Sequence, residues 1–195
     1  MNAEPRIVGI GGTTRPGSST EKALRFALSA CEELGATTAC FPGAELARLA
    51  HYAPELQDRT ETALRLLEEL RRADGVIVAS PGYHGSVSGL VKNALDYAED
   101  LREDPRCYLS GLPVGLIATG AGWQGTVTTL EALRSIVHSL RGWPTPMGVA
   151  VNSTLPVFGP DGEVTDEKAR FQLSTMTGEV MDFVRTRRAS LQPAR

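Results

Sequence analysis

Small and hydroxyl-bearing residues near the N-terminus form a segment whose chemistry suits an oxyanion. Residues 11–17 read Gly-Gly-Thr-Thr-Arg-Pro-Gly, and their glycines and proline exclude a continuous strand or helix there. Ser18 and Glu21 then form a capping box, which is typical of a helix start. The unpaired N–H groups and dipole of a helix start favour an anion, so the sequence predicts a phosphate site. Its predicted contacts are Gly12, Thr13, Arg15, Ser18 and Thr20.

The composition of this loop allows two interpretations. In the first, the hydroxyls of Thr13, Ser18 and Thr20 donate to phosphate oxygens. Arg15 then adds a bidentate, charge-assisted contact. In the second, the loop is an ordinary turn in which Ser18 only caps the helix and Arg15 lies in solvent. Composition alone leaves both interpretations open.

Two well-known phosphate-binding motifs, one for dinucleotides and one for nucleoside triphosphates, are incomplete in this sequence. Gly9 and Gly11 begin a dinucleotide-binding fingerprint, but Thr14 occupies its third glycine position. The second expected strand ends in Cys-Phe-Pro at residues 40–42, without the acid that binds a ribose. The loop also lacks the Gly-Lys-Ser/Thr ending of a nucleoside triphosphate site. Because both motifs are incomplete, the sequence favours a mononucleotide as the ligand of this loop.

Apolar runs alternate with helical patterns along the chain. Strands are expected within residues 6–11, 37–41, 75–79, 114–119 and 147–151. Helices are expected from Ser18 to Gly35, from Thr60 to Leu70, from Ser88 to Leu101, from Leu130 to Gly142, and from near Thr165 to Phe183. Phe183 is expected on the inner face of the last helix. Right-handed crossovers place such helices on both faces of a parallel sheet. The order predicts a single doubly wound α/β domain over residues 1–195, with a five-stranded sheet.

Ligands of such sheets bind beyond the carboxyl ends of the strands, near the point where the strand order reverses. The residues that carry chemistry should therefore follow the first, third and fourth strands. These loops cover residues 11–17, 80–86 and 120–122.

Composition and charge exclude several classes of protein. The net charge is −3, and the only basic cluster, at residues 185–188, is small, so nothing supports nucleic acid binding. No apolar run approaches the roughly 20 residues of a membrane span, and residues 1–6 lack the pattern of a signal peptide. We expect a cytoplasmic protein. Cys31, Cys40 and Cys107 lack the spacing of a disulfide framework or a zinc site, so we expect reduced thiols and no metal.

Residues 12–20 resemble the phosphate loop of the NADPH-dependent FMN reductase family, whose members are flavodoxin-like flavoproteins. The usual family pattern is Gly-Ser-x-Arg-x-x-Ser followed by Asn two residues later. Thr13 and Thr20 depart from it, but each keeps a hydroxyl. Phosphate binding survives such changes.

A second and longer motif follows the third expected strand. The family pattern is Ser-Pro-Glu-Tyr-Asn-Gly-Ser-x-x-Gly-x-x-Lys-Asn-x-x-Asp. The matching residues are Ser80, Pro81, Tyr83, Gly85, Ser86, Gly89, Lys92, Asn93 and Asp96. Gly82 and His84 replace the usual Glu and Asn. Residues 119–122, Thr-Gly-Ala-Gly, are similar to the family's glycine-rich loop after the fourth strand.

The resemblance implies a flavin site along these loops. The ring of FMN would lie along Pro81, Gly82, Tyr83, His84, Gly85 and Ser86. Its pyrimidine end would approach Thr119, Gly120, Ala121 and Gly122, whose backbone N–H groups could stabilise the negative charge of reduced flavin. Two ordinary tight turns, with Tyr83 as a surface aromatic, remain the alternative. Trp123 could cover the flavin, face a partner, or only pack.

Other polar residues are interpreted as structural. Hydride transfer to a flavin needs no protein acid at its first step, so a hydrogen-bonding or solvent-facing His84 is favoured over a proton donor. Lys92 and Asp96 form a helical i, i+4 pair, for which a structural or subunit-contact role is favoured. We assign no catalytic residue, because the flavin carries the chemistry.

The resemblance predicts an NAD(P)H:FMN oxidoreductase in which NADPH or NADH passes a hydride to the flavin N5. Electrons would continue to a small-molecule acceptor, such as free flavin or a quinone, or to a partner monooxygenase. A homodimer or homotetramer is expected. The alternative is a flavodoxin-type electron carrier, but the three loops lack the acidic rim of such carriers. A regulatory relative without flavin is disfavoured because the loops keep their glycines and hydroxyls.

Overall fold

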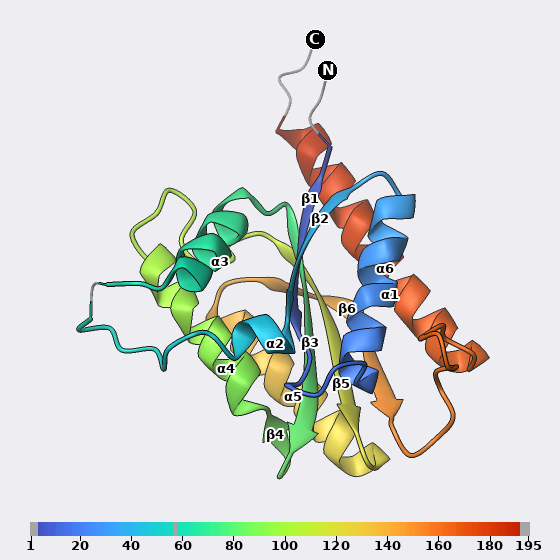
Figure 1. Ribbon diagram of the computed structural model, residues 1–195. Coiled ribbons are helices and arrows are strands. Elements are labelled where there is room, and N and C mark those ends of the chain that lie inside the picture. The colour runs from blue at the N-terminus through green and yellow to red at the C-terminus, as the bar shows by residue number, and fades with distance from the viewer. Residues whose placement is uncertain (1–3, 57, 192–195) are drawn as a thin grey trace.

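Five parallel strands form the main sheet. The chain adds strands first on one side of the first strand and then on the other. The computed structural model describes residues 4–56 and 58–191 (Figure 1). The order is β2 (Thr37–Pro42), β1 (Arg6–Gly11), β3 (Gly75–Tyr83), β5 (Pro113–Gly120) and β6 (Trp143–Asn152). A short sixth strand, β4 (Ser86–Val87), pairs antiparallel with the end of β3. The prediction of a doubly wound parallel sheet is confirmed, with β4 as an addition to the five expected strands.

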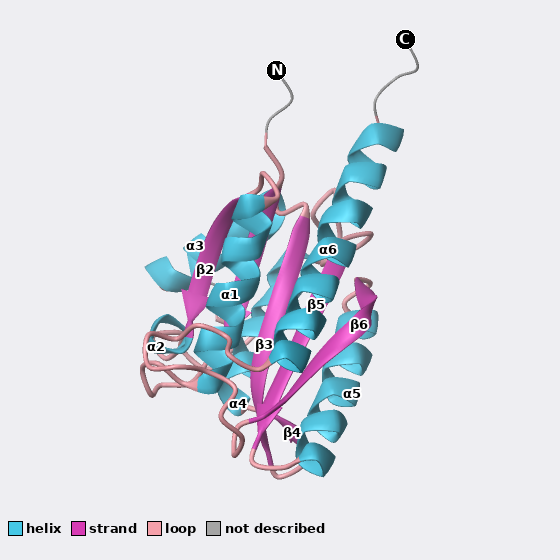
Figure 2. Cartoon of the chain, turned by 90° about the vertical axis from the view of Figure 1, so that its right-hand side faces the viewer, coloured by secondary structure: helices cyan, strands magenta, loops and turns pink. Residues whose placement is uncertain are grey.

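Helices cover both faces of the sheet. One face carries α1 (Ser19–Glu33) and α6 (Glu167–Ser190), which lie in front of the strands in Figure 2. The opposite face carries α3 (Glu61–Arg72), α4 (Gly89–Asp96) and α5 (Trp123–Ser139). A short α2 (Gly43–Leu46) follows β2, and a 3-10 turn, Tyr97–Leu101, continues α4. All the expected helices are therefore present.

The strands read as continuous apolar runs because both of their faces are buried. Ile7 and Ile77 pack with the apolar side chains of α1 and α6. Their neighbours Val8 and Val78 pack on the other side, with α3, α4 and α5. This alternation produces two apolar layers, one on each side of the sheet.

The last strand begins earlier than the sequence pattern indicates. We expected it at Met147, but β6 begins at Trp143 and includes two prolines. Prolines are tolerated here because β6 is the edge strand of the sheet. Arg134 donates to the carbonyls of Thr145 and Pro146 at 3.1 and 3.0 Å, and Glu179 accepts from the Met147 N–H at 2.8 Å. Side chains thus satisfy the backbone where the strand is irregular.

The last helix differs from the expectation at its cap and on one face. Its N-cap is Asp166, which accepts from the Ala169 N–H at 2.7 Å, rather than Thr165, whose N–H donates to the Val157 carbonyl. Phe183 was expected on the inner face, but 39% of it is exposed. Its ring instead lies beside Trp143 from the edge strand, with centroids 6.2 Å apart.

Side chains of α4 and its 3-10 extension hold the long segment between α2 and α3. Asn93, from the second family motif, accepts from the Tyr52 N–H at 2.8 Å and donates to the Ala50 carbonyl at 2.9 Å. Asp100 accepts two hydrogen bonds from Arg59, at 2.6 and 2.9 Å, and one from the Tyr52 hydroxyl at 3.0 Å. The motif residue Asn93 therefore has a structural role.

The change Asp100→Asn is expected to lower the free energy of unfolding by about 3 kcal/mol near neutral pH, because it leaves the mostly buried Arg59 without its counter-charge. The hydrogen bond from Arg59 lowers the pKa of Asp100 in the folded state. The stability from this pair is therefore present above the ordinary aspartate pKa and is lost as pH falls through the lowered folded value. Urea unfolding of both proteins at about pH 7 and about pH 3 should show the difference shrinking in acid.

The matched control is Asp104→Asn, which removes the more exposed ion pair with Arg71. We expect this change to cost at most about 1 kcal/mol. Equal losses in the two variants at neutral pH would contradict the assigned role of Asp100.

Candidate functional site

The loop after β1 curls on itself at the carboxyl edge of the sheet. The Thr13 hydroxyl accepts from the Arg15 N–H and donates to the Arg15 carbonyl, both at 3.2 Å. Gly12 has a φ of +112°, which L side chains rarely adopt, and its N–H donates to the Ala79 carbonyl at 3.3 Å. Arg15 is exposed. The loop thus has an internally fixed shape with one cation on its outer side.

The start of α1 offers backbone donors beside this loop. Ser18 is the N-cap and accepts from the Glu21 N–H at 3.2 Å, while the Glu21 carboxylate accepts from the Gly17 N–H at 3.2 Å. The same carboxylate pairs with Arg25 at 2.7 Å, and this hydrogen bond raises the pKa of Arg25. Other N–H groups of the first turn have no intrahelical acceptor. The predicted N-cap at Ser18 is confirmed, but Glu21 accepts from the Gly17 N–H and not from the Ser18 N–H that a capping box would use. The remaining N–H groups of the first turn can bind an anion.

The structure brings together two predicted site residues from distant parts of the chain. Thr20 lies in the first turn of α1, and Thr119 lies near the end of β5. Both are buried, and their hydroxyl oxygens are 2.6 Å apart in a hydrogen bond. This contact joins the first and third loops of the site. The Thr20 hydroxyl thus already has a partner within the protein.

The segment expected as the second loop is largely a two-residue hairpin. Residues 80–83 continue β3, and Gly82 and Tyr83 pair with Val87 and Ser86 of β4. His84 and Gly85 form the turn, with φ values of +51° and +82°. Positive φ at both central positions defines a type I′ turn, for which Asn-Gly is the preferred sequence. The left-handed backbone at this position favours the Asn that the family usually has, and His is among the residues that tolerate it.

Two contacts fix the base of this hairpin. The buried Ser80 hydroxyl accepts from the Ser88 N–H at 3.0 Å and donates to the Pro81 carbonyl at 2.9 Å. A Cβ on Gly82 would lie 2.5 Å from the Thr129 hydroxyl of α5. Gly82, a departure from the family pattern, thus allows the hairpin to pack against α5. The hairpin presents Tyr83, with 53% of its surface exposed, at the edge of the sheet.

The third loop, residues 120–122, leads into α5, which like α1 begins at the carboxyl ends of the strands. Gly122 is the N-cap of α5 and makes no side-chain cap hydrogen bond, and the first turn contains no acid. The Thr126 hydroxyl donates to the Gly122 carbonyl at 2.6 Å and lies where a Cβ on Gly120 would have to go. The N–H groups and the positive end of the dipole of α5 therefore remain available to a ligand with negative charge.

Two small cavities flank these loops. One, of about 140 Å³, lies between the first loop and the hairpin, where its lining includes Thr13, Pro81 and Tyr83. The other, also of about 140 Å³, lies beyond the start of α5, where it is lined by Trp123 and Asn152 among others. Trp123 is 49% exposed and has the Lys168 ammonium 5.8 Å from its ring centroid. Figure 1 shows the ends of β3, β5 and β6 together at this edge.

Sequence reasoning missed one residue that shapes the first loop. Gly43 opens α2, and a Cβ at this position would overlap the backbone O, C and N atoms of Thr13. The signal in the sequence is the Pro42-Gly43 pair directly after the second strand, at the same edge of the sheet. Taken alone, Pro42 indicates only the end of that strand.

The residues present fit a mononucleotide flavin. The loop before α1 supplies N–H donors, hydroxyls and the cation of Arg15, which suits a phosphate. A Cβ on Gly122 would meet nothing within 4 Å, so the space before α5 is open to a ring that approaches the backbone. The three loops contain no carboxylate side chain of their own, and the carboxylate of Glu21 in the first turn of α1 is paired with Arg25. Fold and site together define a flavodoxin-like flavoprotein.

Comparisons with known proteins lead to the same class. Residues 5–155 match the family model of NADPH-dependent FMN reductases. The chain is 30% identical to an NAD(P)H-dependent FMN reductase of Pseudomonas aeruginosa, over 87% of this chain and 90% of that protein. It is 33% identical to an FMN-dependent NADPH-azoreductase of Staphylococcus aureus, over 67% of each. The chain therefore belongs to the NADPH-dependent FMN reductase family.

Solved structures show the same fold. A flavoenzyme NAD(P)H:(acceptor) oxidoreductase from Paracoccus denitrificans matches with a TM-score of 0.78 and 24% identity, over 93% of this chain and 98% of that one. An NADH:FMN oxidoreductase matches with a TM-score of 0.68 and 22% identity, over 97% and 91%. These similarities confirm the expected flavodoxin-like architecture.

Several predictions are thereby confirmed. The protein is an NAD(P)H-dependent FMN oxidoreductase, its cofactors are FMN and a reduced nicotinamide, and the electron-carrier alternative is not favoured. Members of this family act on small-molecule acceptors. In the described part of the chain, no helix is long and apolar enough to cross a membrane. The roles of individual site residues remain predictions.

Proposed function

We propose that FMN binds across the three loops at the carboxyl edge and is reduced there by NADPH or NADH. The phosphate is held by Gly12, Thr13, Arg15, Ser18 and Thr20. The ring lies along residues 81–86, and residues 119–122 meet its pyrimidine end. When bound, FMN supplies the hydride-accepting atom N5.

The observation that carries this proposal is the convergence of two helix N-termini on one edge of the sheet. The first turn of α1 can bind the phosphate, and α5, with its uncapped N–H groups, can stabilise negative charge at the other end of the ligand. The hairpin between them presents backbone groups and the Tyr83 ring. The protein's contribution is thus to orient the ring and to favour its reduced, negatively charged form.

Anaerobic reduction tests the proposal directly. Purified protein titrated with FMN and with FAD should bind FMN more tightly, because the phosphate loop has no adenylate-binding fingerprint beside it. Addition of NADPH or NADH without air should then bleach the flavin absorbance without any second protein. The proposal fails if neither nicotinamide bleaches the flavin while a separate reductase does, or if FAD binds at least as tightly as FMN.

The partners and the compartment also belong to this proposal. A surface flavin would be open on one side in a monomer, so we propose a homodimer or homotetramer whose second copy completes the nicotinamide pocket. Sedimentation of the active protein as a 20.9 kDa species alone would contradict this. We propose free flavin, a quinone or a partner monooxygenase as the electron acceptor. Cys31, Cys40 and Cys107 are free thiols, which suits a reducing cytoplasm.

A further inference from the structure

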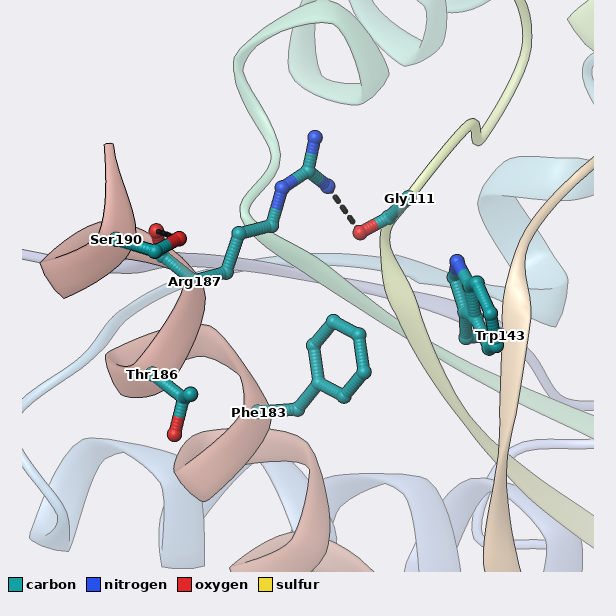
Figure 3. Close-up of a pocket in the computed structure, with 6 residues that line it drawn as sticks. All are labelled: Gly111, Trp143, Phe183, Thr186, Arg187 and Ser190. Atoms are coloured by element: carbon teal, nitrogen blue, oxygen red, sulfur yellow. Dashed lines mark hydrogen bonds between the residues drawn. The ribbon is translucent and has the colours of Figure 1, made fainter.

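A cavity of about 460 Å³ opens at the edge of the sheet opposite the FMN loops, between the start of β6 and the last turns of α6 (Figure 3). Trp143 begins β6 and Asn152 ends it, and strands rise about 3.3 Å per residue, so the cavity lies roughly 30 Å from the flavin loops. This distance excludes direct hydride transfer. The volume lies within the range of small-molecule sites, about 300–1,000 Å³.

Two exposed aromatic side chains form one part of the cavity wall. Trp143 is 59% exposed and Phe183 is 39% exposed, although the two rings come from different elements. Their centroids lie 6.2 Å apart, with an angle of 35° between the ring planes. Figure 3 shows Phe183 projecting from α6 toward the strand that carries Trp143. A flat apolar ligand would cover ring surface that is now in water.

A positioned cation forms another part of the wall. Arg187 donates through Nη1 to the Gly111 carbonyl, as the dashed line in Figure 3 shows. Gly111 has a φ of +72°, and a Cβ there would lie 2.6 Å from this Nη1 and 2.9 Å from Cζ. The guanidinium therefore occupies space that glycine leaves free. Among the described residues, no carboxylate lies within ion-pair distance of Arg187.

A second guanidinium, that of Arg106, interacts electrostatically with Arg187. Burial, and after it the charge of Arg187, lower the pKa of Arg106. Arg106 donates to the carbonyls of Ala73 and Arg71 at 2.6 and 3.0 Å, and the charges of Asp74 and Asp104 offset part of its own. Arg187 is the charged side chain that lines the cavity itself, and its charge favours an anion there.

We propose that this cavity binds a planar aromatic anion, whose ring packs on Trp143 and Phe183 and whose carboxylate or sulfonate meets Arg187. Aromatic surface alone would accept neutral and charged rings equally. The guanidinium of Arg187, which has no carboxylate partner among the described residues, favours rings with a negative group. The site is separate from the flavin site, because Trp143 and Arg187 lie at the ends of β6 and α6 that are far from the flavin loops.

Fluorescence of a single tryptophan can test this in the FMN-loaded protein. The chain has two tryptophans, so Trp123→Phe leaves Trp143 as the only reporter. Anilinonaphthalene sulfonate is the probe, and phenylnaphthylamine, which has the same rings without the sulfonate, is its neutral counterpart. Saturable quenching of Trp143 by the sulfonate is expected, with unchanged flavin absorbance to show that FMN is not displaced.

Two variants in this background separate charge from ring packing. Arg187→Gln should weaken binding of the sulfonate about 10-fold or more and leave binding of the neutral amine nearly unchanged. Phe183→Ala should weaken both ligands. The matched controls on the same helix are Arg185→Gln and Phe171→Ala, since neither residue lines the cavity and Phe171 is 65% exposed. Thermal unfolding checks each fold, and Arg187→Lys provides a milder test of the charge.

The proposal is overturned if Arg187→Gln and Arg187→Lys bind the sulfonate as tightly as the parent protein does. It is also overturned if the neutral amine binds as tightly as the sulfonate. A third contrary outcome would be that Trp143 is not quenched and that Phe183→Ala reduces the oligomer size in sedimentation. A second copy of the chain, and not a small ligand, would then cover the cavity.

Discussion

Gly43→Ala is expected to weaken FMN binding roughly 100-fold or more while the protein still folds. The new Cβ would overlap backbone atoms of Thr13, so the first loop must move, because no flexible side chain can give way instead. Each charge-assisted hydrogen bond to the phosphate contributes about 1.5–3 kcal/mol, and a displaced loop loses more than one of them. Overpacking of this kind lowers the free energy of unfolding by about 1–3 kcal/mol. Flavin fluorescence titration and urea unfolding measure the two effects.

Gly178→Ala provides the matched control. Gly178 lies within α6, and a Cβ there would meet nothing within 4 Å. The same chemical change should therefore stabilise the protein by about 1 kcal/mol, as alanine does in a helix, and leave FMN binding unchanged. If Gly43→Ala bound FMN as tightly as the original protein, the phosphate could not be held by the first loop.

The sheet and most helix boundaries could be predicted because their signals are local. The apolar runs of β1, β3 and β5 are buried on both faces, and such strands show their burial directly in sequence. Ser18 and Thr60 each cap a helix by accepting from an N–H three residues later, so both partners lie within one short window. Local patterns of this kind need no knowledge of tertiary contacts.

The features that escaped prediction depend on contacts between distant segments. Pro81 and Gly82 disfavour a strand in the sequence, yet Pro81 pairs with Thr119 of β5 and Gly82 pairs with Val87 of β4. Phe183 has helical spacing to the core positions of α6, but the start of β6 places Trp143 beside it instead. Gly43 acquires its role only because α2 packs against the first loop. Tertiary packing decides all three cases.

In the candidate site too, local features could be predicted and contacts between distant segments could not. The glycines, hydroxyls and helix caps of the three loops are visible in the sequence, and the family resemblance supplied their connection to FMN. The hydrogen bond between Thr20 and Thr119 was not foreseen, because it joins residues 99 positions apart. It ties α1 to β5, so two loops that were predicted separately form one connected surface.

Arg15→Ala is expected to lower the affinity for FMN about 10-fold to 150-fold, because it removes a charge-assisted contact worth about 1.5–3 kcal/mol. Arg15 is exposed, and the loop conformation depends on the Thr13 hydroxyl and the Arg15 backbone, which alanine retains. The loop should therefore keep its shape without the guanidinium. Titration of the protein with FMN, followed by flavin fluorescence, measures the loss.

Riboflavin separates the phosphate contact from every other effect of this change. It lacks the phosphate, so its affinity should change little, and the preference of the variant for FMN over riboflavin should shrink by about the same factor as the FMN affinity. Arg48→Ala, which removes another exposed arginine outside the three loops, should leave both affinities unchanged. Equal losses for both flavins would show that Arg15 supports the loop itself. Unchanged FMN binding would place its guanidinium in solvent, and the phosphate would then depend on the N–H groups of α1 and the loop hydroxyls alone.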